Sequence, residues 1–210
     1  MEERRKAETG AFEAQEITFF SELPPRGGVL EYEDVMEDVG RAARLDRADK
    51  ALDSLVNTEA VLTAQHEERV AGITVGTVAT ASLHPPRLTV AIRREHPACG
   101  MVIQSGTFAI NFLGEGQEAL SERFASPHDE AMSLFAGVEY TRGVSSGAPI
   151  LRKALGFVEC RVAETLESGD HVVILADLLD GGSLHDGKPL VSIGRYKPTL
   201  DISDNLSVGS

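Results

Sequence analysis

The sequence lacks features that define several large classes of proteins. It has no tryptophan and only two cysteines among 210 residues, and its 20 basic residues against 33 acidic ones give a net charge of −13. This acidic balance argues against binding of nucleic-acid backbones or membrane surfaces through a basic patch. No apolar run approaches the roughly 20 residues of a membrane span, and MEERRKAETG is not followed by the apolar core of a signal peptide. We therefore expect a soluble, cytoplasmic protein without nucleic-acid or membrane partners.

The sequence also predicts neither a metal site nor a catalytic nucleophile. Cys99 and Cys160 lie far apart without CxxC spacing, so we expect reduced structural thiols. The six histidines form neither HxH nor HExxH, and no metal site is predicted. The stretch GVSSG (143–147) has the GxSxG spacing, but it runs into SSGAP and is most simply a loop rather than a nucleophile elbow. The sequence contains no GxGxxG and no P-loop, so it carries no common nucleotide fingerprint.

Composition and periodicity divide the chain into four predicted segments. Residues 1–30 are polar and end in FSELPPRGG, which predicts a flexible arm. Over 31–56, apolar residues recur at steps of three and four, which predicts a helix that packs on the domain. Residues 57–197 are the predicted folded domain, long enough to bury a core, and 198–210 are a C-terminal tail.

The pattern of residue types after residue 57 is typical of short β-strands. Runs rich in Val, Ile and Thr are separated by turn residues: AVLTA (60–64), RVAGITV (69–75), LTVAIR (88–93), FAINFL (108–113), GFVECRVAETL (156–166), HVVILADLL (171–179) and LVSIGR (190–195). Helical patterns interrupt them only at 96–104 and 115–135. Because strands and helices do not alternate regularly, a mainly antiparallel β-barrel with a few peripheral helices is favoured over a doubly wound sheet.

Alternation within FVECRVAE predicts how one of these strands is oriented. Two sets of side chains should face opposite ways. The first set is Phe157, Glu159, Arg161 and Ala163, and the second is Val158, Cys160, Val162 and Glu164.

The segment GITVGTVATASLHPPRLTVAIRREH, residues 72–96, is polar but largely uncharged until its end. Its hydroxyls and small residues are followed, one strand later, by Arg93 and Arg94. A flavin phosphate needs several N–H or O–H donors and one or two cations, and the flavin ring needs a flat surface with N–H donors. The segment could supply both. The alternative is an ordinary exposed strand.

The triplet Gly169-Asp170-His171 stands directly before the apolar run HVVILADLL. Glycine permits a tight corner, and the carboxylate could orient the imidazole. The pattern indicates either a hairpin corner with a solvated histidine or a site at which a ligand docks against the sheet.

Six pieces of the chain, in order over residues 48–196, resemble the flavin reductase-like family, the FMN-binding split barrel. They are ADKALDSLVNTEAVLTA, GITVGTVATASLHPP, TFAINFL with ALSERFASP, GAPILRKALGFVECRV, ESGDH and KPLVSIGRYKPTL. The resemblance covers nearly the whole predicted domain and implies an antiparallel split barrel.

The resemblance implies an NAD(P)H-dependent FMN reductase that transfers a hydride from nicotinamide C4 to flavin N5. FMN is implied rather than FAD, with NADH or NADPH as co-substrate, a homodimer, and a partner oxygenase or another electron acceptor. His171 is the implied catalytic residue, placed where the nicotinamide arrives. The implied cofactor-binding residues are Thr74, Val75, Gly76, Thr77, Thr80, Ala81, Ser82, Arg93, Arg94, Phe124, Gly169, Asp170 and Tyr196.

The sequence departs from the family pattern in its central stretch. The family commonly has Ser-Ser-Phe-Thr-Ser where this chain has Gly76-Thr77-Val78-Ala79-Thr80, and Glu59 stands at a usually apolar position. Two other functions therefore stay open. One is an FMN-binding electron-transfer flavoprotein without NAD(P)H activity, and the other is a degenerate barrel that serves as an interaction module.

Overall fold

The computed structural model describes residues 44–45, 47–48, 50–126 and 134–194. The chain divides into two compact units between Leu45 and Asp46, and all described strands lie in the second. The predicted arm, the predicted tail, Tyr196 and most of the predicted helix over 31–56 lie outside the described residues, so these remain predictions.

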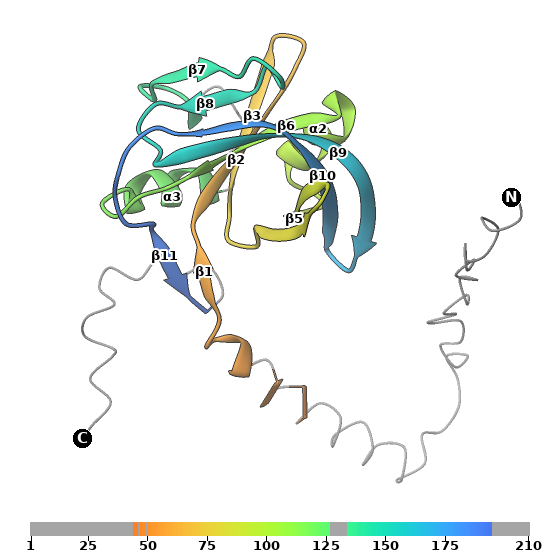
Figure 1. Cartoon of the computed structure of the whole chain (residues 1–210). Coiled ribbons are helices and arrows are strands. Elements are labelled where there is room, and N and C mark those ends of the chain that lie inside the picture. The colour runs from red at the N-terminus through yellow and green to blue at the C-terminus, as the bar shows by residue number, and fades with distance from the viewer. Residues whose placement is uncertain (1–43, 46, 49, 127–133, 195–210) are drawn as a thin grey trace, which may run out of the picture. The chain divides into compact units, whose positions relative to one another are not determined.

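Seven strands form one sheet in the order β3-β2-β6-β9-β10-β5-β4, and every pairing within it is antiparallel (Figure 1). The strands are β2 (Ala60–His66), β3 (Arg69–Val75), β4 (Ala79–Leu83), β5 (Pro86–Arg93), β6 (Thr107–Phe112), β9 (Gly156–Ser168) and β10 (His171–Ser183). The predicted mainly β, antiparallel fold is confirmed. Within the described residues, no pairing joins the end strands β3 and β4 into a closed barrel.

Two short ladders and two helices complete the described fold. β1 (Val56–Thr58) pairs with β11 (Val191–Ile193), and β7 (Tyr140–Arg142) pairs with β8 (Pro149–Leu151). The helices are α2 (Pro97–Ser105) and α3 (Glu118–Ala125). α2 begins where sequence rules place it: the His96 Nδ1 accepts a hydrogen bond from the Ala98 N–H at 3.1 Å, and proline occupies the first turn.

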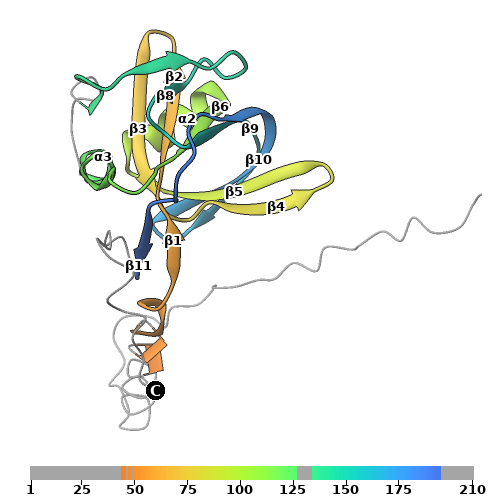
Figure 2. The same ribbon diagram turned by 60° about the vertical axis from the view of Figure 1, so that its left-hand side comes forward.

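The larger core cluster lies on one face of the sheet, against α2. On β5 and β10, every second side chain enters it: Leu88, Val90 and Ile92 from β5, and Val172, Ile174 and Ala176 from β10. The residues between them necessarily face the other way. Figure 2 shows β4 and β5 as a hairpin that extends from the rest of the sheet. The strands that carry the predicted site are thus fixed from one side only.

A second core cluster contains Phe124, which the family resemblance placed at the cofactor. Phe124 is fully buried, and its ring centroid lies 5.1 Å from that of Phe135 in an edge-to-face contact. A Cβ at Gly72 would lie 2.6 Å from the Phe124 ring, so only glycine lets α3 approach β3 this closely. The structure places Phe124 in the core and not on a surface that a cofactor reaches, because its ring packs between α3 and β3.

A buried carboxylate anchors the turn between β7 and β8. Glu159 is 1% exposed, and its Oε1 accepts hydrogen bonds from the backbone N–H groups of Ser145 (3.0 Å) and Ser146 (2.7 Å) and from the Ser146 hydroxyl (2.7 Å). These donors offset the cost of burying the carboxylate. Both cysteines are buried free thiols, as expected. Burial, with the nearby Glu159, raises the pKa of the Cys160 thiol to about 12.

Candidate functional site

The side of β5 and β10 that faces away from the α2 core forms a continuous row of paired positions, which we call the open face. It consists of Arg87, Thr89, Ala91 and Arg93 on β5 and of His171, Val173, Leu175 and Asp177 on β10. Strand register sets His171 opposite Arg93 and Asp177 opposite Arg87. Half-buried small and apolar side chains fill the interval between these polar ends. The open face is therefore a floor of small and apolar side chains with a charged group at each end.

The His171 end is built by a tight hairpin turn. Gly169 has φ +58°, a left-handed conformation that glycine adopts without strain. The His171 Nδ1 lies 2.7 Å from Asp170 Oδ1, and the Arg94 N–H donates to the Asp170 carbonyl at 2.9 Å. The hydrogen bond from His171, with the charge of that ring, lowers the pKa of Asp170. The triplet is thus a hairpin corner whose imidazole is fixed by its neighbour at the end of the open face.

The two consecutive arginines have different surroundings. The Arg94 guanidinium donates to the Gly169 carbonyl at 2.6 Å and lies 3.4 Å from the Glu167 carboxylate, so it already stabilises the turn. Arg93 faces His171 across the strands and, within the described ranges, forms no ion pair or side-chain hydrogen bond. Arg93 is therefore the better placed of the two for an anionic ligand.

The hydroxyl-rich stretch divides between two strands and two environments. Thr74 is buried in β3, where its hydroxyl donates to the Ser121 carbonyl at 2.6 Å, and Val75 and Gly76 are buried beside it. The Thr77 hydroxyl instead accepts from the Ala91 N–H (3.1 Å) and donates to the Ala91 carbonyl (3.2 Å). Thr77 thereby fixes the segment before β4 to the edge of the open face.

Along β4, a register shift selects which side chains reach this face. Ala79 lies opposite Thr89 and Ser82 lies opposite Arg87, so both belong to the open-face side. Thr80 lies opposite the core residue Leu88 and faces the other way, while Ala81 falls at the shift. The structure therefore groups Thr77 with Arg93 and His171, places Ser82 beside Arg87 at the other end of the open face, and separates Thr74 and Thr80 from both.

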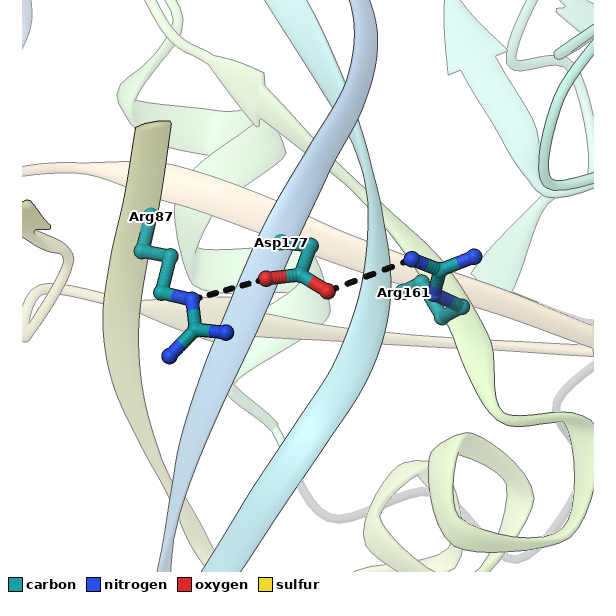
Figure 3. A network of polar contacts seen from close by, with 3 residues as sticks. All are labelled: Arg87, Arg161 and Asp177. Atoms are coloured by element: carbon teal, nitrogen blue, oxygen red, sulfur yellow. Dashed lines mark hydrogen bonds and ion pairs between the residues drawn. The ribbon is translucent and has the colours of Figure 1, made fainter. Parts of the chain in front are cut away.

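The second charged end of the open face was not predicted from the sequence. Asp177 accepts from Arg87 Nε at 2.8 Å through one oxygen and from Arg161 Nη2 at 3.2 Å through the other (Figure 3). Hydrogen bonds from Arg161 and Arg87 lower the pKa of Asp177. We call these three residues the Arg–Asp–Arg cluster. Strand alternation indicated the face of Arg161, but only the register of three strands could reveal the cluster.

A separate cavity of about 450 Å³ lies beside the β7–β8 hairpin. It is lined by Phe157, Glu159 and His185 among others, and by none of the predicted site residues. Among the residues that the structure describes, no group of three or more His, Cys, Asp or Glu side chains could hold a metal ion. No helix in the same part of the chain is both long and apolar enough to cross a membrane.

Comparison with known proteins identifies the family to which the chain is similar. Residues 52–200 match the family model described as "Flavin reductase like domain". The chain is 35% identical over 135 residues to an "NADPH-flavin oxidoreductase" of Streptomyces viridifaciens, covering 63% of this chain and 69% of that one. It is 31% identical over 134 residues to "Diflavin flavoprotein A 1" of Synechocystis sp., covering 63% of this chain and 23% of the relative. This chain thus spans about a quarter of the length of the diflavin flavoproteins it matches.

Among solved structures, the chain resembles that of "Flavin Reductase HpaC complexed with NADP+". The TM-score is 0.63 at 25% identity, over 71% of this chain and 93% of the other.

Proposed function

The chain belongs to the flavin reductase-like domain family, and from that membership we propose that it is an NAD(P)H-dependent FMN reductase. The observation that carries the proposal is the open face, which gathers His171, Arg93 and Thr77 at one end of the same floor. When bound, FMN supplies the acceptor for a hydride from nicotinamide C4. The remaining tasks, which are binding and alignment, belong to the chain's own residues.

The residues of the open face fit a flavin by size and by chemistry. Ala79 and Ala91 are small enough for a planar ring to approach the backbone closely. Arg93 offers a guanidinium without an ion pair in the described part of the chain, which suits the FMN phosphate. The Ser82 hydroxyl lies on the same side of the sheet, but opposite Arg87 at the other end of the open face. Arg94, although tied to the turn, keeps Gly169 and Asp170 in place beside Arg93.

His171 is proposed to position the nicotinamide ring or to move a proton at its Nε2. Its Nδ1 is held by Asp170, so Nε2 is the ring nitrogen left for a substrate. The His171 side chain is 30% exposed, which leaves it accessible while limiting its rotation. Tyr196 stays a predicted neighbour of the cofactor.

We propose that the protein works in the cytoplasm and passes reduced flavin to an acceptor protein such as an oxygenase. Both cysteines are free and buried, which agrees with a reducing compartment. We also propose that the sheet is the split barrel of its family. Two bulges in the β9–β10 pairing, which increase local bending, support this closure. Cell fractionation, capture of reduced flavin by an added oxygenase, and an experimental structure test these three points.

The activity is tested on the purified chain by two measurements. FMN is titrated while its visible spectrum is followed, and the loss of NADH and NADPH absorbance is then recorded with FMN present. We expect a saturable change in the FMN spectrum and oxidation of at least one nicotinamide. FMN that stays bound without nicotinamide oxidation would support an electron-transfer flavoprotein instead. Absence of any FMN binding would contradict both and favour an interaction module.

A homodimer is the proposed assembly, and exposed apolar residues before and within β1 support it. Leu52, Leu55 and Val56 are between 46% and 66% exposed, and exposed apolar side chains that lie close together in the chain often mark interfaces. We expect the full chain to sediment as a dimer and its Leu55→Glu variant to sediment as a monomer. Val144→Glu, at a 95% exposed apolar position in a turn, is the matched control and should stay dimeric. A monomeric wild type would refute the proposal.

A further inference from the structure

We propose that Arg87 and Arg161 bind a phosphate on the adenylate half of a dinucleotide. This phosphate belongs to the nicotinamide co-substrate or to FAD. FMN lacks an adenylate half, so the site is distinct from the one proposed for the FMN phosphate. The inference rests on the proposed function, because it names a further part of the substrate that the same open face recognises.

The Arg–Asp–Arg cluster and Ser82 form one row of side chains that crosses four strands. Ser82 on β4 lies opposite Arg87 on β5, Arg87 lies opposite Asp177 on β10, and Asp177 lies opposite Arg161 on β9. Directly opposed residues of antiparallel strands share a face. The two guanidinium groups and the serine hydroxyl therefore lie on the same side of the sheet, with Asp177 between the arginines (Figure 3).

The donors in this row exceed what the protein itself uses. Asp177 takes one N–H from each guanidinium, and within the described residues neither arginine donates any other hydrogen bond. The Ser82 hydroxyl likewise has no hydrogen-bond partner there. Each guanidinium carries five N–H donors, and two cations against one carboxylate leave a net positive charge in a chain whose net charge is −13. Phosphate oxygens are the ligands that such a planar, two-pronged donor set prefers.

The distance to His171 suits a dinucleotide. His171 and Asp177 are six residue steps apart along β10, without an irregularity in the pairing with β5, which amounts to about 20 Å of extended chain. On β5 and β10 the floor between the two ends carries Ala91 and Val173, then Thr89 and Leu175, and no charge. On β9, Glu164 lies opposite Leu175 and borders this floor. A ligand with a nicotinamide or flavin ring at one end and a phosphate toward the other can span this floor.

Asp177 also preorganises the site. Arg87 and Asp177 are only 32% and 26% exposed at their side chains, so the Arg87 guanidinium is held in a partly dehydrated position before a ligand arrives. The Arg161 side chain is 61% exposed, and its hydrogen bond to Asp177 is what orients it. The competing explanation is that the cluster only ties three strands together. The two explanations predict opposite changes in phosphate affinity when the Asp177 carboxylate is removed. A purely structural cluster would be weakened, so affinity would not rise. A phosphate site would bind more tightly, because both guanidinium charges would be left without a carboxylate partner.

The test is calorimetric titration of the full-length protein with ADP, with adenosine 2′-phosphate and with adenosine. Arg87→Ala and Arg161→Ala should each weaken phosphate-dependent binding about tenfold, the loss of one charge-assisted contact. Asp177→Asn should tighten it about fivefold, the effect of removing one nearby negative charge. Arg69→Ala, at the exposed first residue of β3, is the matched control and should match wild type. Thermal melts by circular dichroism check folding.

The outcomes separate the ligand sources and can overturn the inference. Stronger binding of adenosine 2′-phosphate than of ADP means that the two arginines bind the 2′-phosphate of NADPH. Stronger ADP binding means that they bind a pyrophosphate, and competition by NADH or by FAD then identifies the source. The inference fails if adenosine binds as well as ADP and adenosine 2′-phosphate do, if the arginine variants stay within twofold of wild type, or if Asp177→Asn loses affinity as Arg87→Ala does. Normal FMN reduction by NADH in such a case would leave the proposed function intact.

Discussion

Replacing His171 with alanine is expected to slow flavin reduction by NAD(P)H about tenfold to a hundredfold in single-turnover measurements. Alignment of reacting groups and proton transfer each contribute effects of about this size. His171 is the imidazole at the end of the open face, held by Asp170 at 2.7 Å and facing Arg93 across the strands. Rapid-mixing absorbance at the flavin band, with saturating FMN, measures the step directly.

Two further variants separate a role of the imidazole from a general disturbance. Asp170→Asn keeps the shape of the neighbour but removes its charge, so we expect a smaller loss than for His171→Ala. His66→Ala, at the β2–β3 turn, removes a histidine from outside the open face and should leave the rate unchanged. A His171→Ala protein that reduces flavin as fast as wild type would remove this residue from the mechanism, whatever its effect on stability.

The parts of this site that could be predicted from sequence are the parts with a local signature. A glycine before an acid and a histidine marks a tight turn at any strand end, so Gly169 and His171 could be located without a structure. The hydroxyl-rich stretch was also visible. Its division was not, because a stretch of composition does not reveal that β3 ends at Val75 and buries Thr74.

Register is the information that composition lacks. Alternation in FVECRVAE correctly separated Cys160, which is buried, from Glu159 and Arg161 on the opposite side. It failed at Glu164, because a bulge between Leu175 and Ala176 returns Glu164 to the open-face side. A single unpaired residue reverses every later assignment, and nothing in the local sequence marks this bulge.

The Arg–Asp–Arg cluster shows the same limit over a longer range. Arg87, Arg161 and Asp177 are widely separated in the chain and become neighbours only because β5, β10 and β9 pair in one register. From the sequence, each of these charged residues taken singly is interpreted as an ordinary solvated residue. Their excess of positive charge becomes visible only when the three strands are assembled.

Glu159→Ala is expected to lower the free energy of unfolding by about 3 kcal/mol, because the turn between β7 and β8 loses an acceptor for three donors. Proteins of this size are stable by only about 5–15 kcal/mol, so the loss should be plain in urea unfolding. Circular dichroism is the suitable probe, since the chain has no tryptophan.

Glu159→Gln decides whether shape or charge matters at this position. Glutamine keeps a carbonyl oxygen that can accept from the Ser146 N–H but carries no negative charge, so it should lose only about 1 kcal/mol, the difference between a charge-assisted and a neutral hydrogen bond. Equal losses in both variants would mean that the negative charge is essential to the turn. An alanine variant as stable as wild type would mean that water replaces the carboxylate, and that burial of Glu159 contributes nothing to holding the β7–β8 hairpin.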